Sequence, residues 1–191
     1  MSADHPQTPD PPASSDGTGF SHLDREGRAR MVDVSDKAVT RRVAAASCRV
    51  HLAPSTIARL GSMPKGDAIT VARLAGIQAA KRVDELIPLA HTLPLDHVDL
   101  EIEPAVDHVV VRSRITVTAR TGAELEALVA CAQGALALYD MVKAVEKEAV
   151  ITDLRLEAKR GGRSGDWRRA GDDGTADETD EGEDRGAGDA S

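Results

Sequence analysis

Four segments of the chain alternate between apolar and polar side chains, and their order strongly constrains the fold. The alternating segments are residues 37–52, 97–104, 108–119 and 149–159. Alternation with a period of two is typical of strands that bury one face. The second and third segments are separated only by a short turn, so we expect them to form an antiparallel hairpin.

Two longer segments with apolar residues at helical spacing lie between these strands. The first is expected to begin at Asp67 as N-cap and to end at Pro88, because a residue before proline disfavours helix. The second is expected to run from Thr121 to residue 147, with Glu124 completing a capping box. The order β-α-β-β-α-β predicts an α+β, ferredoxin-like fold: a four-stranded antiparallel sheet with two long helices on one face.

The scarcity of aromatic residues limits which residue types can build the core and which classes of partner the chain can bind. The chain has one Phe, one Tyr and one Trp, so its core must be built from Ala, Val, Leu and Ile. Without aromatic platforms for stacking bases, single-stranded nucleic acid is not an expected partner. Apolar residues of both parities in the 108–119 strand predict that the second face of the sheet is also covered, most simply by another subunit.

Charge divides the chain into three parts. Residues 1–19 are rich in Pro, Ser and Asp, and residues 171–191 hold nine acids and one arginine. Such segments bury too little apolar surface to order themselves. We therefore predict a disordered tail over 1–19, one domain over 20–166, and an acidic disordered tail over 167–191.

Nothing in the sequence predicts a membrane segment or an oxidising compartment. No N-terminal stretch resembles a signal peptide, and no continuous apolar run reaches ~18 residues. Cys48 and Cys131 lie in apolar contexts without CxxC spacing, as expected of buried thiols. The predicted location is cytoplasmic, with no membrane partner.

The second long helix carries an unusual set of charges. Glu126, Gln133 and Asp140 are spaced by seven residues and form one polar line, which Lys143 and Lys147 continue. Such a line is usually only the solvated side of a helix. Here it is sparse, and its acid and bases gather at one end. An Asp beside two Lys keeps a depressed pKa, and the set could transfer protons and hold phosphate.

Three loop segments offer further candidates, each with a simpler alternative. Lys65-Gly66-Asp67 precedes a helix and could bind an anion, or could be only a turn and cap. His91 lies in a loop between two prolines, although a lone loop histidine is more often ordinary surface. Residues 159–166 (KRGGRSGD) could approach an anion or be a flexible basic exit, and they are not a GxxxxGK[ST] loop. No His or Cys pair has metal spacing, so we expect no metal.

Together these stretches are similar to one known family. The colinear matches are MVDVS (31–35), KGD (65–67), ARLAGIQAAKR (72–82), LIPLAH (86–91), TGAELEAL (121–128), YDMVKAVEK (139–147) and AKRGGRSGD (158–166). They resemble the cyclic pyranopterin monophosphate synthase (MoaC) family of molybdenum cofactor biosynthesis, from about residue 20 to residue 166.

The resemblance implies a lyase that converts 3′,8-cyclo-7,8-dihydroguanosine 5′-triphosphate to cyclic pyranopterin monophosphate and releases pyrophosphate. It implies no cofactor and no metal. It also implies a homohexamer, a trimer of dimers with active sites at the dimer interface. The substrate would come from the preceding radical enzyme of the pathway, which is the expected functional partner.

The resemblance also assigns residues by position. It implies catalytic roles for Asp140, Lys143 and Lys65. It implies substrate binding by Leu89, Ala90, His91, Leu125, Glu126 and Lys159. We expect Asp140 and Lys143 to transfer protons, and Lys65, Lys159 and Arg160 to stabilise the polyphosphate. Ala90 stands where the family has Cys, and Leu125 where it has Met, so a thiol and a thioether are missing.

Two other functions fit the same pattern. A ferredoxin-like domain can be a ligand-binding sensor, because fold does not determine function. A structural scaffold would explain the fold but not the Asp-Lys-Lys set.

Overall fold

The computed structural model describes residues 28–163 and 165–170. It divides into two units, Met1–Asp33 and Val34–Ser191, and all elements named below belong to the second. The predicted domain start at residue 20 lies outside the described residues and stays a prediction. The predicted 1–19 tail lies outside the described residues.

The second unit combines one antiparallel sheet with helices, which confirms the α+β class. The strands are β1 (Thr40–His51), β2 (Leu95–Pro104), β3 (His108–Ala119), β4 (Val150–Arg160) and β5 (Trp167–Arg168). The helices are α1 (Pro54–Ile57), the 3-10 turn η1 (Leu60–Ser62), α2 (Ala68–Ala80), α3 (Val83–Leu86) and α4 (Glu124–Val142). The sheet order is β2-β3-β1-β4-β5, with every pair antiparallel.

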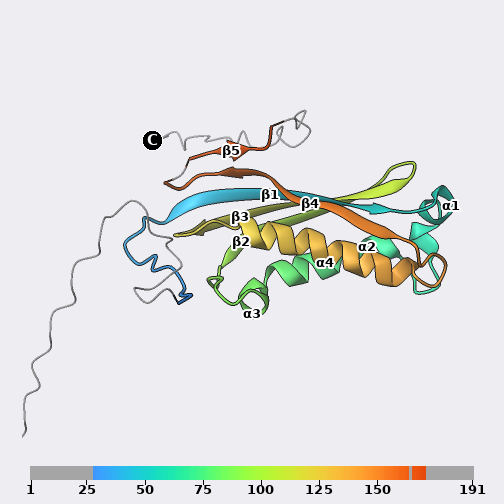
Figure 1. The fold of residues 1–191 in the computed structure, drawn as a ribbon, viewed down its shortest axis with the longest axis horizontal. Coiled ribbons are helices and arrows are strands. Elements are labelled where there is room, and N and C mark those ends of the chain that lie inside the picture. Colours follow the sequence, from blue (N-terminus) through green and yellow to red (C-terminus); the bar gives the residue numbers. More distant parts are fainter. Residues whose placement is uncertain (1–27, 164, 171–191) are drawn as a thin grey trace, which may run out of the picture. The chain divides into compact units, whose positions relative to one another are not determined.

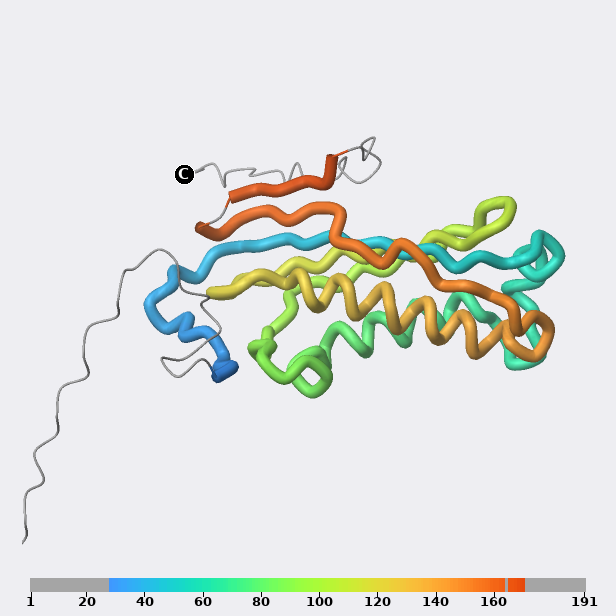
Figure 2. The backbone as a smooth tube through the Cα atoms, viewed as in Figure 1, coloured from blue at the N-terminus to red at the C-terminus, as the bar shows by residue number. Residues whose placement is uncertain are grey.

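The expected four-stranded sheet is therefore wrong in its strand count. β5 pairs Trp167 with Lys159 and Arg168 with Ala158 at the edge beyond β4. It lies inside the segment assigned to the C-terminal tail, so the ordered part of the chain continues past residue 166. Figure 2 shows β5 running beside β4. The turn before it uses Gly161 and Gly162, both with positive φ, a conformation that glycine adopts without steric cost.

Both long helices cover the same face of the sheet, as Figure 1 shows. Many of their buried residues are small: Ala68, Ala72, Gly76, Ala79 and Ala80 on α2, and Ala127, Ala130, Cys131, Gly134 and Ala135 on α4. Small residues let the two helices approach closely, which fits a core without aromatic side chains. α4 is long and apolar enough to span a membrane by composition alone, yet half of that stretch is buried in the fold, where α4 packs against α2 and the sheet.

The helix boundaries differ from the sequence expectation at three points. The predicted 67–88 helix is broken at Lys81 and Arg82, and the break lets Val83 enter the core at 2% exposure. The predicted capping box at Thr121 is wrong, because the N-cap is Ala123 and no side chain caps the helix. α4 also ends at Val142, so Lys147 lies beyond it. Asp67 is the N-cap of α2, as predicted, and accepts hydrogen bonds from the amides of Ile69 and Thr70.

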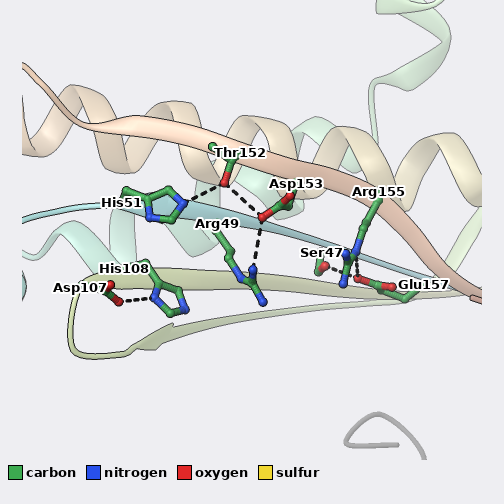
Figure 3. Close-up of polar contacts among 9 residues, drawn as sticks. All are labelled: Ser47, Arg49, His51, Asp107, His108, Thr152, Asp153, Arg155 and Glu157. Carbon is green, nitrogen blue, oxygen red and sulfur yellow. Dashed lines mark hydrogen bonds and ion pairs between the residues drawn. The ribbon is translucent and has the colours of Figure 1, made fainter. Parts of the chain in front are cut away.

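The face of the sheet away from the helices is polar. On β3 this face carries His108, Val110, Arg112, Arg114, Thr116 and Thr118, and only Thr116 is buried. The expectation that another subunit covers this face stays a prediction, since Val43, Ala45 and Thr116 on it are buried even in one chain. Its charges are largely paired along the sheet, as Figure 3 illustrates for Arg49 with Asp153 and Arg155 with Glu157.

Gly76 lies where α2 packs against Ala130 of α4, and replacing it tests this packing. A β-carbon at Gly76 would overlap Leu100 Cδ2 and lie 2.6 Å from the carbonyl oxygen of Ala130. We expect Gly76→Ala to lower the free energy of unfolding by about 1–3 kcal/mol, because the backbone must shift to admit the methyl group. The denaturation midpoint measures this. Gly61→Ala is the matched control, since nothing lies within 4 Å of a β-carbon there, and a loss as large in the control would contradict the packing account.

Candidate active site

Asp140, Lys143 and Lys65 come together at the carboxyl end of α4. Lys143 Nζ lies 2.7 Å from Asp140 Oδ1, and Lys65 Nζ lies 2.7 Å from Asp140 Oδ2. Lys65 also donates to the backbone carbonyl of Asp140 at 3.0 Å. Carbonyls in the last turn of a helix lack intrahelical partners and carry the negative end of the helix dipole, so an ammonium is stabilised there.

A short turn places Lys65 at this position. Met63 and Gly66 exchange two backbone hydrogen bonds, of 3.1 and 2.8 Å, around the turn that carries Lys65. Gly66 has φ +108°, which a residue with a side chain rarely adopts. α2 then begins directly after Asp67 and packs along α4. Lys65 thus reaches a residue 75 positions away.

The amino end of α2 is already occupied by a carboxylate of this chain. Asp67 Oδ1 accepts from the amides of Ile69 at 3.0 Å and Thr70 at 3.2 Å, and Oδ2 accepts from the Thr70 hydroxyl. The hydrogen bond from the Thr70 hydroxyl is the main cause of a lowered pKa for Asp67. The structure therefore supports the alternative interpretation of KGD as a turn and helix cap. Lys65 acts in the cluster through its side chain, which pairs with Asp140.

The two lysines set the charge of Asp140. Hydrogen bonds from Lys143 and then Lys65 lower the pKa of Asp140 to about 2, and Asp140 in turn raises the pKa of Lys143. All three side chains are between 43% and 51% exposed, so these ion pairs contribute little to folding. A carboxylate with so low a pKa is a weak base at neutral pH. An anionic ligand that drew the ammonium groups away would raise the pKa of Asp140 and make it a better base.

A second group of candidate residues lies at the amino end of α4. Lys159 on β4 places Nζ 3.4 Å from Glu124 Oε1. Glu126, one residue beyond Leu125, is buried at 4% exposure, whereas Leu125 is 40% exposed. Glu124 is a site neighbour that the sequence analysis missed, because it was assigned to a capping box and nothing in the sequence links it to a residue 35 positions later.

The loop after α3 belongs to this second group. Leu89, Ala90 and His91 are half-buried, and the amide of Ala90 donates to the carbonyl of Ile87 at 3.0 Å. Thr92 donates to Asp84 at 2.5 Å, which ties the loop back to α3. Asp84 also contributes to the electrostatic environment of Glu126, so α3 and the start of α4 are neighbours.

The two groups lie at opposite ends of one helix. Asp140 follows Glu126 by fourteen residues, which corresponds to about 21 Å along an α-helix. One copy of the chain therefore brings together Lys65, Asp140 and Lys143, but does not bring Glu126 or Lys159 to them. The resemblance places the active site at a dimer interface, and one copy of the chain does not test that expectation.

Burial gives Glu126 an unusual titration. Desolvation is the largest cause, and the nearby acids Glu124 and Asp84 add to it, so that the pKa of Glu126 rises to about 7. The side chain of Glu126 is therefore neutral in the folded chain at mildly acidic pH, whereas it would already be ionised in the unfolded chain.

Among the described residues no group of three or more His, Cys, Asp or Glu side chains could hold a metal ion.

Glu126→Gln tests this burial through the pH dependence of stability. The pKa of Glu126 is higher in the folded chain than in the unfolded chain. At low pH Glu126 is therefore protonated in both states and costs the fold no stability. As the pH rises through about 7, the cost of keeping Glu126 buried lowers the free energy of unfolding. We expect the variant to gain about 2–3 kcal/mol over the parent between about pH 5 and pH 8. Chemical denaturation across that range measures the difference. Glu101→Gln, at an exposed position of β2, is the control, and a flat difference for Glu126→Gln would contradict the raised pKa.

Comparison with known proteins gives the chain close relatives. The model of the MoaC family matches residues 31–162. A cyclic pyranopterin monophosphate synthase of Streptomyces avermitilis is 51% identical over 166 residues, which cover 86% of this chain and 96% of the relative. The synthase of Chloroflexus aggregans is 53% identical over 154 residues, covering 78% of this chain and 93% of the relative. Cyclic pyranopterin monophosphate synthase 3 of Mycobacterium tuberculosis is 52% identical over 153 residues, covering 78% and 86%.

Proposed function

This chain belongs to the MoaC family, and from that premise we propose that it is a cyclic pyranopterin monophosphate synthase acting in molybdenum cofactor biosynthesis. It converts 3′,8-cyclo-7,8-dihydroguanosine 5′-triphosphate to cyclic pyranopterin monophosphate and releases pyrophosphate. The observation that carries the proposal is an identity above 50% to synthases over most of both chains. The Lys65-Asp140-Lys143 cluster supplies chemistry that suits an anionic substrate.

We propose the following division of roles. Asp140, Lys143 and Lys65 are catalytic residues. Leu89, Ala90, His91, Leu125, Glu126 and Lys159 bind substrate, and Arg160 supports Lys159 at the polyphosphate. Since the two groups are about 21 Å apart on one helix, a complete site takes one group from each of two copies. This arrangement fits a homohexamer built as a trimer of dimers.

The charges of the cluster suit both halves of the reaction. A triphosphate competes with Asp140 for the two ammonium groups, which raises the pKa of Asp140 and prepares it to accept a proton during ring reorganisation. Formation of a cyclic monophosphate requires a substrate hydroxyl oxygen to bond to the α-phosphorus while the bond to the bridging oxygen of pyrophosphate breaks. Fixed cations stabilise the charge that develops on the leaving pyrophosphate.

Several wider features belong to the same proposal. The four long strands and the helices α2 and α4 form a ferredoxin-like unit, to which β5 is added. The enzyme works in the cytoplasm and receives its substrate from the preceding radical enzyme of the pathway.

The purified chain should release one pyrophosphate for each cyclic pyranopterin monophosphate formed from the cyclic triphosphate substrate. Coupled phosphate detection and mass spectrometry of the product measure both. Tight binding of the substrate without pyrophosphate release would instead support the sensor function. The absence of both binding and turnover would support a structural scaffold. Either result would contradict the proposed activity.

A further inference from the structure

Two histidines from neighbouring strands lie side by side at one end of the uncovered sheet face. His51 ends β1 and His108 begins β3, and the antiparallel register pairs them directly. Their ring centroids are 5.9 Å apart, and the ring planes are tilted by 41°. Both side chains point away from the helices, because the adjacent residues Val50 and Val109 belong to the core. Figure 3 shows the pair with its hydrogen-bond partners.

An aspartate determines which nitrogen of His108 carries the hydrogen. Nδ1 of His108 lies 2.7 Å from Oδ1 of Asp107. This hydrogen bond is the main cause of a lowered pKa for Asp107, so the carboxyl group is ionised at neutral pH and can only accept. Nδ1 of His108 therefore carries the hydrogen, and the neutral ring keeps its lone pair on Nε2.

A threonine determines the same property of His51. Thr152 on β4 donates its hydroxyl hydrogen to Oδ2 of Asp153 at 3.3 Å, and Arg49 donates to the same oxygen. A hydroxyl group has one hydrogen to donate, so the Thr152 oxygen accepts in its 2.9 Å hydrogen bond with Nε2 of His51. Nε2 of His51 therefore carries the hydrogen, and the lone pair of the neutral ring lies on Nδ1.

The arrangement matches what a metal ion requires of two histidines. A histidine that binds a metal almost always donates its other ring N–H to an oxygen, which fixes the tautomer and the ring orientation. With a metal–nitrogen bond of about 2.0–2.1 Å, and about 1.1 Å more from nitrogen to ring centre, one ion can join rings whose centroids are up to about 6.4 Å apart. The observed 5.9 Å lies within that limit. The broad χ2 torsion of histidine lets each ring turn its free nitrogen toward a common ion.

We propose that His51 and His108 form a two-histidine site for a divalent late first-row transition metal ion, of which Ni²⁺, Cu²⁺ and Zn²⁺ are the candidates. Nδ1 of His51 and Nε2 of His108 bind the ion, and imidazole nitrogen suits these metals. Thr152 and Asp107 hold the two rings in the binding tautomers. The described residues offer no group of three His, Cys, Asp or Glu ligands, so water takes the remaining coordination positions.

The proposed metal site is separate from the proposed active site. It lies on the face of the sheet opposite to α2 and α4, and it uses no residue assigned to catalysis or substrate binding. The bound ion links β1 to β3. Local spacing in the sequence does not reveal the pair, because strand pairing brings the two histidines together.

Titration of the untagged, chelator-treated chain with Ni²⁺ tests the site. Calorimetry at about pH 7.5, where imidazole is neutral, should show binding of one ion per chain. We expect His51→Asn and His108→Asn each to weaken the affinity by about tenfold or more, and Asp107→Ala by about tenfold. His97→Asn is the matched control and should bind like the parent. His97 is an exposed histidine of β2 whose register partner, Thr116, lies near the far end of β3.

The double variant His51→Asn/His108→Asn distinguishes one shared ion from two separate ones. Either substitution alone removes the bridge, so the double variant should bind as weakly as each single variant. Ni²⁺ should also raise the melting temperature of the parent and of His97→Asn, because the paired rings exist only in the folded chain, but not that of His51→Asn. Circular dichroism checks that each variant is folded. Without added metal, His51→Asn should release pyrophosphate at the parent rate, which keeps this test distinct from that of the proposed activity.

Two results would overturn the proposal. Unchanged Ni²⁺ affinity in both His51→Asn and His108→Asn would show that the ion binds elsewhere, for example at the acids of residues 171–191. Two ions per parent chain, with losses from the single variants that add up in the double variant, would show that each ring binds an ion of its own.

Discussion

Replacing Asp140 with asparagine should lower kcat for pyrophosphate release by about 10²–10⁴-fold. The amide has nearly the same shape but cannot accept a proton at neutral pH, and it loses the charge that holds Lys65 and Lys143 at 2.7 Å. Because Asp140 is half-exposed and its ion pairs contribute little to folding, the variant should keep the parent's circular dichroism spectrum and melting temperature.

Asp153→Asn is the matched control for this variant. Asp153 is also a half-exposed carboxylate in an ion pair, with Arg49 at 3.3 Å, but it lies on the uncovered face of the sheet. Its positive φ of 54° is one that asparagine also adopts. We expect its kcat to stay within about twofold of the parent. An Asp140→Asn variant as active as this control would remove Asp140 from the catalytic residues.

Most of the regular structure could be predicted from side-chain periodicity. Strand β2 follows the alternation of Val98, Leu100 and Ile102, and α2 starts where Asp67 predicts. The misses required information from distant parts of the chain. β5 is a two-residue strand that exists through pairing with β4, and the start of α4 lacks a side-chain cap while Glu124 pairs with Lys159. No local pattern encodes either contact.

The candidate site shows the same division between local and distant information. Asp140 and Lys143 lie three residues apart and are neighbours by helical geometry alone. Lys65 joins them because small residues let α2 pack closely along α4, which no spacing of charges reveals. The separation of Glu126 from Asp140 could have been calculated from the helical rise. That calculation alone excludes one shared cleft within a single copy of the chain.

Mixing two inactive variants tests most directly whether the site is shared between copies. Asp140→Asn disables the group at the carboxyl end of α4, and Lys159→Ala disables the group at its amino end. Each variant alone has every site damaged. In a mixed dimer, one site receives both substitutions, and the other receives Asp140 and Lys159 from the unaltered halves of the two chains.

Co-refolding the two variants in equal amounts and measuring pyrophosphate release per chain gives the answer. Random assortment makes half of the dimers mixed, each with one intact site of two, so the shared-site account predicts recovery to about one quarter of the parent rate. Size-exclusion chromatography and differently tagged chains establish that mixed assemblies are present. Mixed assemblies that stay as inactive as either variant alone would show that each copy builds its site from its own residues, in contradiction to the account.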